Sequence, residues 1–158
     1  MAEPLVDQVL QKIDEVRELY YRLILLVGPA GSGKTSVLQE VSVVSSAPLI
    51  NVNLELSRRM LDLTERQQTL RLPRLLGEIV GEVTGELVLL DNIEILFDVH
   101  LKQDPLRLLQ GLSRNKTIVA AWNGTIVGGY LTYAEPGHPE YRRYPIRDFL
   151  LVSPEVKT

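Results

Sequence analysis

Residues 28–35 read Gly-Pro-Ala-Gly-Ser-Gly-Lys-Thr, which has the spacing of a phosphate-binding Walker A loop. Glycines let such a loop curl until its backbone N–H groups face an anion, and the dipole of the following helix adds to the attraction. Lys34 would reach the β- and γ-phosphates, and the Thr35 hydroxyl would hold Mg²⁺. We therefore expect ATP and Mg²⁺ as cofactors. The predicted binding residues are Gly28, Pro29, Ala30, Gly31, Ser32, Gly33, Lys34 and Thr35.

A carboxylate that could complete the metal site is Asp91, which follows the four apolar residues 87–90. Ligands of open α/β sheets bind at the carboxyl ends of the strands, so Asp91 would face the Mg²⁺ held by Thr35. An isolated aspartate at a strand end is more often a turn residue. The Walker A loop earlier in the chain favours the metal role here.

The residues that would catalyse hydrolysis leave alternatives open. Directly after Asp91, where many ATP-hydrolysing proteins place glutamate, this chain has Asn92, which cannot act as a base. Glu94 is the candidate base, with a solvated helix-start carboxylate as the alternative. Asn123 ends another apolar run and could hold the attacking water, or form a turn with Gly124.

A segment rich in arginine and tyrosine lies between residues 130 and 144. Arg142 or Arg143 could act at the γ-phosphate of a neighbouring subunit, as a catalytic arginine supplied in trans. The tyrosines of this segment fit three alternatives: a protein interface, stacking on single-stranded nucleic acid, or rings that pack within their own loop. These tyrosines are Tyr130, Tyr133, Tyr141 and Tyr144.

Hydrophobic spacing predicts alternating strands and helices along one domain, residues 1–158. We expect a helix at 5–20 and a core at 22–152, with Pro73 as a kink or restart point. The predicted strands are 23–27, 49–54, 87–90, 117–121 and 146–152; the predicted helices are 35–44, 57–63, 65–83 and 104–113; and 124–145 is predicted as loop or hairpin. This order predicts an α/β, three-layer P-loop NTPase fold, with an approximately five-stranded, mostly parallel sheet, helices on both faces and no C-terminal helical lid.

Composition narrows the possible functions. The chain has no cysteine and only two histidines, which excludes disulfides and thiolate metal sites and argues against an imidazole-based metalloenzyme. Its formal net charge of −3 gives no general reason for DNA binding, so any DNA contact would be local. Neither a signal sequence nor an apolar run long enough for a membrane span is present, and we expect a cytoplasmic location.

The order of these motifs resembles the additional-strand (ASCE) P-loop ATPases, and the AAA+ group in particular. Over most of its length the chain is similar to the BrxF family, the small P-loop proteins of type 3 BREX (bacteriophage exclusion) systems. That similarity is carried by residues 51–57, 89–97 and 131–141, which read NVNLELS, LLDNIEILF and LTYAEPGHPEY. The resemblance implies a bacterial antiviral role beside a methyltransferase, a helicase and a large ATPase.

Taken together, the sequence favours a minimal ATPase whose nucleotide state controls assembly with itself or with other BREX proteins. Two alternatives remain open. Asn92 is compatible with a nucleotide-gated binding switch that hydrolyses little ATP, and the arginine pair gives weak support for a small-molecule kinase.

Overall fold

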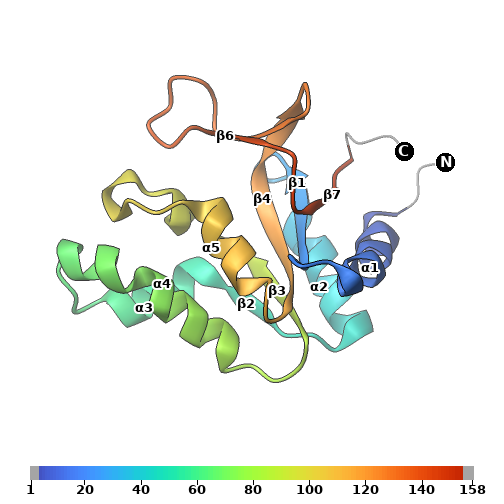
Figure 1. The fold of residues 1–158 in the computed structure, drawn as a ribbon, viewed down its shortest axis with the longest axis horizontal. Coiled ribbons are helices and arrows are strands. Elements are labelled where there is room, and N and C mark those ends of the chain that lie inside the picture. The colour runs from blue at the N-terminus through green and yellow to red at the C-terminus, as the bar shows by residue number, and fades with distance from the viewer. Residues whose placement is uncertain (1–3, 155–158) are drawn as a thin grey trace.

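The structure, a computed structural model, describes residues 4–154 and contains one mixed sheet between two layers of helices (Figure 1). Five strands form its parallel part in the order β2 (Leu49–Asn51), β3 (Leu87–Asp91), β4 (Thr117–Val127), β1 (Leu23–Gly28) and β7 (Leu150–Val152). The register pairs Gly28 with Asn123 and Asn51 with Asp91. The carboxyl ends of the strands therefore place residues from distant parts of the sequence at one edge.

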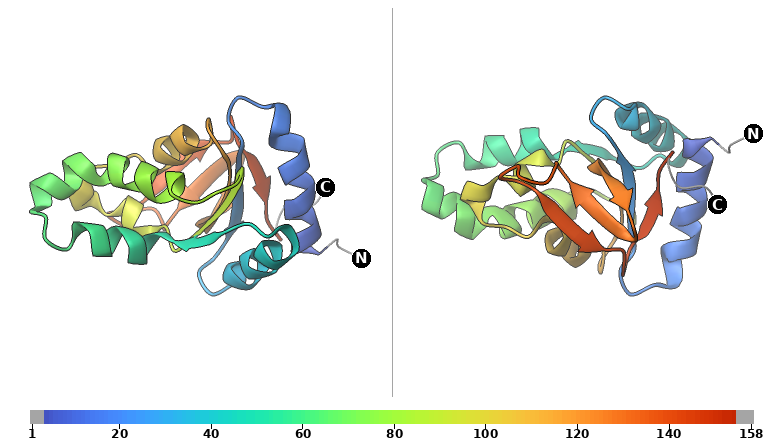
Figure 2. Two further views of the ribbon diagram at one scale, coloured as in Figure 1. Left: turned by 90° about the horizontal axis from the view of Figure 1, so that it is seen from below. Right: turned by 90° about the horizontal axis from the view of Figure 1, so that it is seen from above.

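Each face of the sheet packs against its own helices, as Figure 2 shows from below and above. Because side chains alternate along a strand, Leu23, Leu25 and Val27 of β1 face one core, whereas Ile24 and Leu26 face the other. The second core contains α1 (Leu5–Glu15) and α2 (Lys34–Ser45), and the first contains α3 (Val52–Met60), α4 (Glu65–Gly81) and α5 (Pro105–Leu112). Short 3₁₀ turns are η1 (Val16–Glu18), η2 (Glu94–Phe97) and η3 (Val99–Leu101). The predicted three-layer α/β fold is confirmed.

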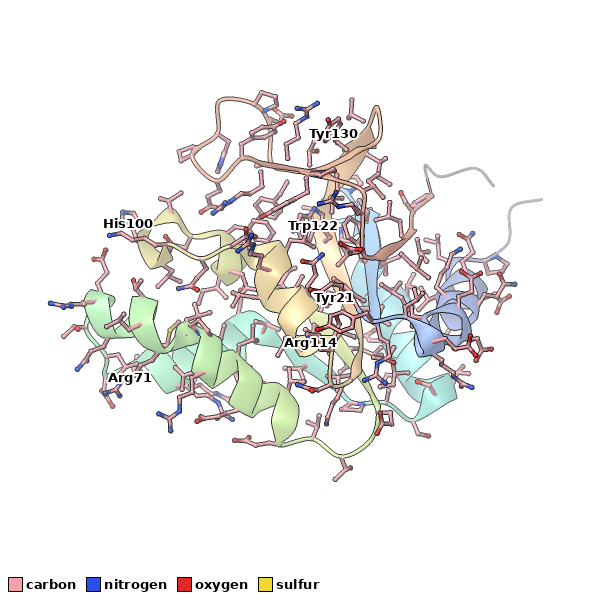
Figure 3. All side chains as sticks on the ribbon, viewed as in Figure 1. Tyr21, Arg71, His100, Arg114, Trp122 and Tyr130 are labelled. Carbon is pink, nitrogen blue, oxygen red and sulfur yellow. The ribbon has the colours of Figure 1, made fainter. Side chains whose placement is uncertain are left out.

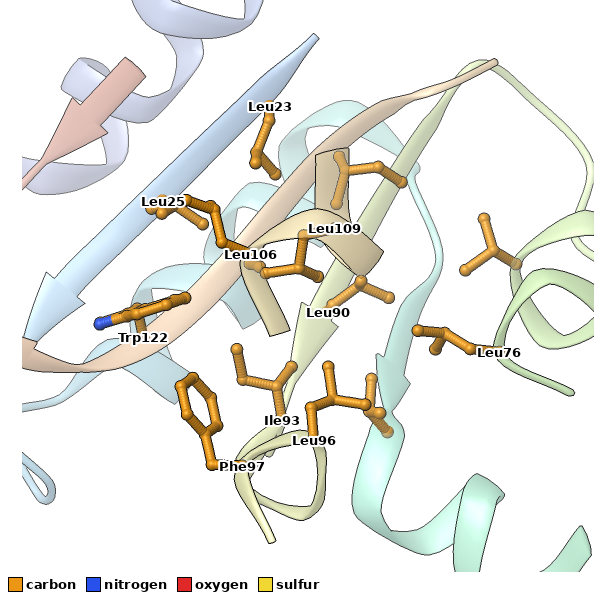
Figure 4. Packing of buried hydrophobic residues seen from close by; sticks show 14 of the residues in the cluster. Leu23, Leu25, Leu76, Leu90, Ile93, Leu96, Phe97, Leu106, Leu109 and Trp122 are labelled. Carbon is orange, nitrogen blue, oxygen red and sulfur yellow. The ribbon is translucent and has the colours of Figure 1, made fainter. Parts of the chain in front are cut away.

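The sheet has two more strands than predicted, because β4 continues well past the expected end at residue 121. Its second half pairs antiparallel with β5 (Tyr130–Tyr133), which in turn pairs with β6 (Arg142–Pro145). Trp122 lies fully buried where the parallel and antiparallel parts meet, with its ring edge-on to Phe97 at 5.0 Å between centroids (Figure 4). The same Phe97 ring stacks on Tyr133. This aromatic contact holds the hairpin of β4, β5 and β6 above the parallel sheet.

Three predicted element boundaries are wrong, the first of them for a local reason. The strand expected at 49–54 ends at Asn51, since the Asn51 side chain accepts a hydrogen bond from the Leu54 amide (3.0 Å) and begins α3 there. The last strand begins at Leu150 rather than at 146. The N-terminal helix also stops earlier than expected, at Glu15, and continues as the 3₁₀ turn η1.

Pro73 neither breaks α4 nor restarts it, and α4 runs without interruption from Glu65 to Gly81. Proline has no N–H, so the carbonyl of Thr69, one turn earlier, loses its helical donor. The Gln103 side chain donates to that carbonyl at 2.9 Å. A contact from outside the helix thus replaces the missing bond, which helical periodicity alone could not reveal. Among residues 4–154, no helix is both long and apolar enough to cross a bilayer.

Candidate nucleotide site

The loop between β1 and α2 has the backbone that a phosphate site requires. Gly33 adopts φ 91°, a left-handed conformation suited to glycine, and α2 starts directly after it. Side chains cap the starts of α3, α4 and α5, whereas Gly33 offers none to the first turn of α2. The first N–H groups of a helix have no acceptor within the helix, so those of α2 can donate to an anion.

Lys34, the Walker A lysine, folds back onto this loop. Its Nζ donates to the carbonyls of Gly28 (2.9 Å) and Pro29 (2.7 Å) and to the Ser32 hydroxyl (3.3 Å). Burial lowers the pKa of the Lys34 ammonium, and the nearby carboxylates of Asp91 and Glu94 act in the opposite direction. The structure therefore holds one ammonium group against the carbonyls and the Ser32 hydroxyl of the loop.

Thr35 and Asp91 meet where the metal site was expected. The Thr35 hydroxyl donates to Asp91 Oδ2 at 2.6 Å, although 56 residues separate the two in sequence. Asp91 is buried, and its Oδ1 accepts from the Asn92 amide at 2.9 Å. One hydroxyl and one carboxylate are hard oxygen donors that suit Mg²⁺, which otherwise takes ligands from water and substrate phosphates. Accordingly, residues 4–154 contain no cluster of three acidic or histidine side chains that would bind a metal without a nucleotide.

Asn92 explains how Glu94, rather than the next residue, enters the site. Asn92 has φ 53°, in the left-handed region that asparagine tolerates better than glutamate does. Its carbonyl accepts from the Asn53 amide at 2.9 Å, which fixes the turn against the start of α3. The chain then enters η2, which begins at Glu94. The position that holds glutamate in many ATPases is thus used here for a sharp turn.

The Glu94 carboxylate lies between two asparagine amides. Its Oε1 accepts from Asn123 Nδ2 at 3.0 Å, and Asn53 Nδ2 is 3.5 Å from its Oε2. The Asn53 Oδ1 accepts from the Ile95 amide at 2.8 Å, so the Asn53 side chain is held at both ends. Sequence reasoning missed Asn53 because it was placed inside a strand. The asparagine cap at Asn51 was the local signal that α3 begins there.

These groups surround one cleft of about 330 Å³ at the mouth of the loop. It is lined by Ala30, Gly31, Gly33, Lys34, Thr35, Asp91, Asn92, Glu94 and Asn123. Most of the candidate residues for binding, metal coordination and water activation therefore line one cavity, at the carboxyl edge of the parallel sheet.

Arg142 and Arg143 lie elsewhere. They lie in the segment predicted as loop or hairpin, where they belong to strand β6, and within residues 4–154 neither lines the cleft described above. Arg142 donates to the carbonyl of Gln103 at 2.7 Å, whereas the Arg143 guanidinium lies over the Tyr130 ring at 3.6 Å. Any contact of either arginine with phosphates bound in this cleft would therefore involve a second copy or a rearrangement of β6.

The tyrosines of the hairpin divide into two groups. Tyr133 stacks on Phe97 and Tyr144 contacts Trp122, so both belong to the core. Tyr144 also donates to Asp104 at 3.0 Å, and burial raises its pKa. Tyr130 lies high on the hairpin, beyond Trp122, as the labels in Figure 3 show, and with Tyr141 it lines a second cavity. Tyr133 and Tyr144 thus pack on the aromatic core, whereas Tyr130 packs against Arg143 and, like Tyr141, lines the second cavity.

The strand order and the loop between β1 and α2 are those of a P-loop NTPase-like fold. No family model matches the sequence, and no curated protein matches it significantly. Twelve chains of solved structures match it in fold. One is PCH-2 of C. elegans, with 18% identity and a TM-score of 0.38, covering 78% of this chain and 36% of that one. The chain thus spans about a third of the length of PCH-2, and so distant a likeness assigns no activity.

Proposed function

We propose that this protein binds ATP with Mg²⁺, hydrolyses it, and changes its assembly with itself or with other proteins of a bacterial BREX system according to the nucleotide it holds. The observation that most supports this is the convergence of four side chains on one cleft. Thr35 contacts Asp91 at 2.6 Å, and Glu94 contacts Asn123 at 3.0 Å.

In this proposal the loop amides and Lys34 hold the phosphates. The Lys34 ammonium would exchange its contacts with the Gly28 and Pro29 carbonyls for phosphate oxygens, whose negative charge would favour the protonated form. Thr35 and Asp91 would hold Mg²⁺, which in such sites neutralises charge on the phosphates. These roles need only the oxygen and nitrogen atoms that already face the cleft.

Glu94 would take a proton from the attacking water, and Asn123 would hold that water. A general base must reach the water directly, and Glu94 lines the cleft together with Lys34 and Asp91. Asn53 would act as a positioning residue, since it fixes both the turn at Asn92 and the direction of Glu94.

Assembly is the second part of the proposal. The similarity to the BrxF family, stated above from three sequence segments, suggests BREX proteins as partners. A role in trans for Arg142 or Arg143 is compatible with their position outside the cleft of their own chain. Arg143 is the better candidate, because it is exposed on β6 whereas Arg142 is tied to Gln103.

The central test measures nucleotide binding by calorimetry and phosphate release for three variants. Lys34→Ala should lose the Mg²⁺-dependent binding of ATP. Glu94→Gln should bind ATP and Mg²⁺ normally but release phosphate about 10²- to 10⁴-fold more slowly, the usual contribution of a general base. Glu40→Gln, the same change on the exposed side of α2, should behave like the parent. If the parent shows no heat with ATP and Mg²⁺, the proposal is wrong.

A second measurement separates the alternatives. If an arginine acts in trans, specific activity should fall on hundredfold dilution, and Arg143→Ala should remove that dependence. Tight binding with unchanged ATP after hours would instead favour a nucleotide-gated switch. Phosphate release without an added acceptor would argue against a small-molecule kinase.

A further inference from the structure

A larger cavity of about 750 Å³ lies beside the nucleotide cleft. The β4–β5–β6 hairpin and the segment 134–141, which forms the loop drawn above the sheet in Figure 1, supply most of its wall. The cavity and the cleft share two lining residues, Ala30 of the Walker A loop and Asn123 at the bend of β4. Ligands in the two spaces would therefore be neighbours.

The wall of this larger cavity is fixed by hydrogen bonds within segment 134–141. The His138 amide donates to the Glu135 carbonyl at 2.9 Å, and the Tyr141 amide donates to the His138 carbonyl at 3.0 Å. The Glu140 amide donates to His138 Nδ1 at 3.0 Å. Two consecutive turns thus fix the backbone of this segment and the His138 ring, and Tyr141 follows directly in the same wall, as in the largely preformed sites usual for small molecules.

The chemistry of the lining suits a flat ring that carries hydrogen-bond donors. Tyr130, Tyr141 and His138 offer ring surfaces, and the Arg143 guanidinium over Tyr130 adds another planar group. Thr125 and Thr132 join their hydroxyls at 2.8 Å in the same wall. Two carboxylates also line the cavity, those of Glu135 and Glu140. Carboxylates accept hydrogen bonds from amino groups of bases but repel phosphate.

We propose that this larger cavity binds a nucleobase with an exocyclic amino group, separately from the nucleotide in the Walker A cleft. The base would stack on Tyr141 and His138, and a carboxylate of Glu135 or Glu140 would accept from its amino group. A cavity of about 750 Å³ is within the range of small-molecule sites. The base could come from a free nucleotide or from an unpaired position in single-stranded DNA.

Tyr133 connects the two spaces. It lines the larger cavity, and its pKa is raised to about 12 by burial and by the nearby carboxylates of Glu140 and Glu94. Glu140 lines the larger cavity and Glu94 lines the cleft, so the Tyr133 phenol lies near one carboxylate of each space. A base in the cavity would border Asn123, which donates to Glu94. This coupling rests on the proposed function of the cleft, whereas base binding itself does not.

The test titrates adenosine into the full chain, alone and after addition of Mg²⁺ and one equivalent of a non-hydrolysable ATP analogue per chain, so that the analogue fills the Walker A cleft without saturating the base site. Adenosine has no phosphate for the Walker A loop, so it reports on the base site. We expect adenosine to bind in both conditions and also to Lys34→Ala, with affinity reduced about tenfold or more in Tyr141→Ala and retained in Tyr141→Phe, which keeps the ring. Thermal unfolding of the Tyr141 variants controls for folding. Arg143 is not mutated in this test, because it is also the proposed arginine in trans.

A twelve-residue oligo(dA) identifies the source of the base. Binding at least tenfold tighter than adenosine would indicate single-stranded DNA, and equal affinity would indicate a free nucleotide. The inference is wrong if neither probe binds the parent, if Tyr141→Ala binds as well as Tyr141→Phe, or if the ATP analogue displaces adenosine completely. Failure of the Walker A cleft to bind ATP would leave adenosine binding intact, so the two proposals fail separately.

Discussion

Among the glycines, Gly124 is the position where adding one methyl group should reduce the stability of the fold most. It lies in β4 directly after Asn123, opposite Tyr133 of β5. A methyl group there would overlap the carbonyl oxygen of Thr132 and would lie 2.8 Å from the indole nitrogen of Trp122. That nitrogen donates to the same carbonyl at 3.0 Å. Gly124→Ala therefore forces β4 and β5 apart and breaks a buried hydrogen bond.

The size of the effect follows from these two losses. Overpacking costs about 1–3 kcal/mol, and a buried indole N–H left without an acceptor costs about 1–3 kcal/mol. We expect a loss of about 3 kcal/mol in the free energy of unfolding, which corresponds to roughly 10 °C in Tm for a chain of this size. Because Asn123 is adjacent, ATP affinity should fall as well.

The assay is thermal and urea unfolding of Gly124→Ala beside Gly77→Ala. Gly77 lies inside α4 and has no atom within 4 Å of the added methyl group. Alanine there should stabilise by about 0.5–1 kcal/mol, since it restricts the unfolded chain and favours the helix. If Gly124→Ala melts within about 2 °C of the parent, β4 and β5 do not pack as closely at Gly124 as in the structure.

Two further predictions concern ionisation and backbone geometry. Burial raises the pKa of Tyr133 to about 12, so this phenol contributes stability at pH below 10 and loses that contribution as the pH rises toward 12. Tyr133→Phe should therefore reduce the fall of Tm between pH 10 and 12, and an unchanged fall would contradict the raised pKa. Asn92→Glu should lower the free energy of unfolding in urea by about 1–2 kcal/mol, because φ is 53° at this position, and it should not increase ATP turnover. Asn92→Gly should unfold like the parent, and a faster Asn92→Glu enzyme would contradict the left-handed turn at this position.

Sequence patterns were most informative where the chemistry is local. The loop at 28–35 and the apolar run before Asp91 indicated the cleft, since each depends on a short stretch of chain. Helix boundaries were less predictable. Pro73 was expected as a kink or restart point, yet α4 continues through it, and the Gln103 side chain supplies the donor that the Thr69 carbonyl loses. That contact joins residues 34 positions apart, beyond the reach of any local rule.

The sequence by itself determined the class of fold, because buried parallel strands need apolar residues on both faces and a phosphate loop needs glycine at fixed positions. Only the tertiary structure decided which polar groups meet. The pairing of Glu94 with Asn123 and Asn53 depends on the strand order β2-β3-β4-β1 and on the left-handed turn at Asn92. The larger cavity likewise exists only because the β4–β5–β6 hairpin rises beside the Walker A loop, and long-range packing rather than local propensity fixes that position.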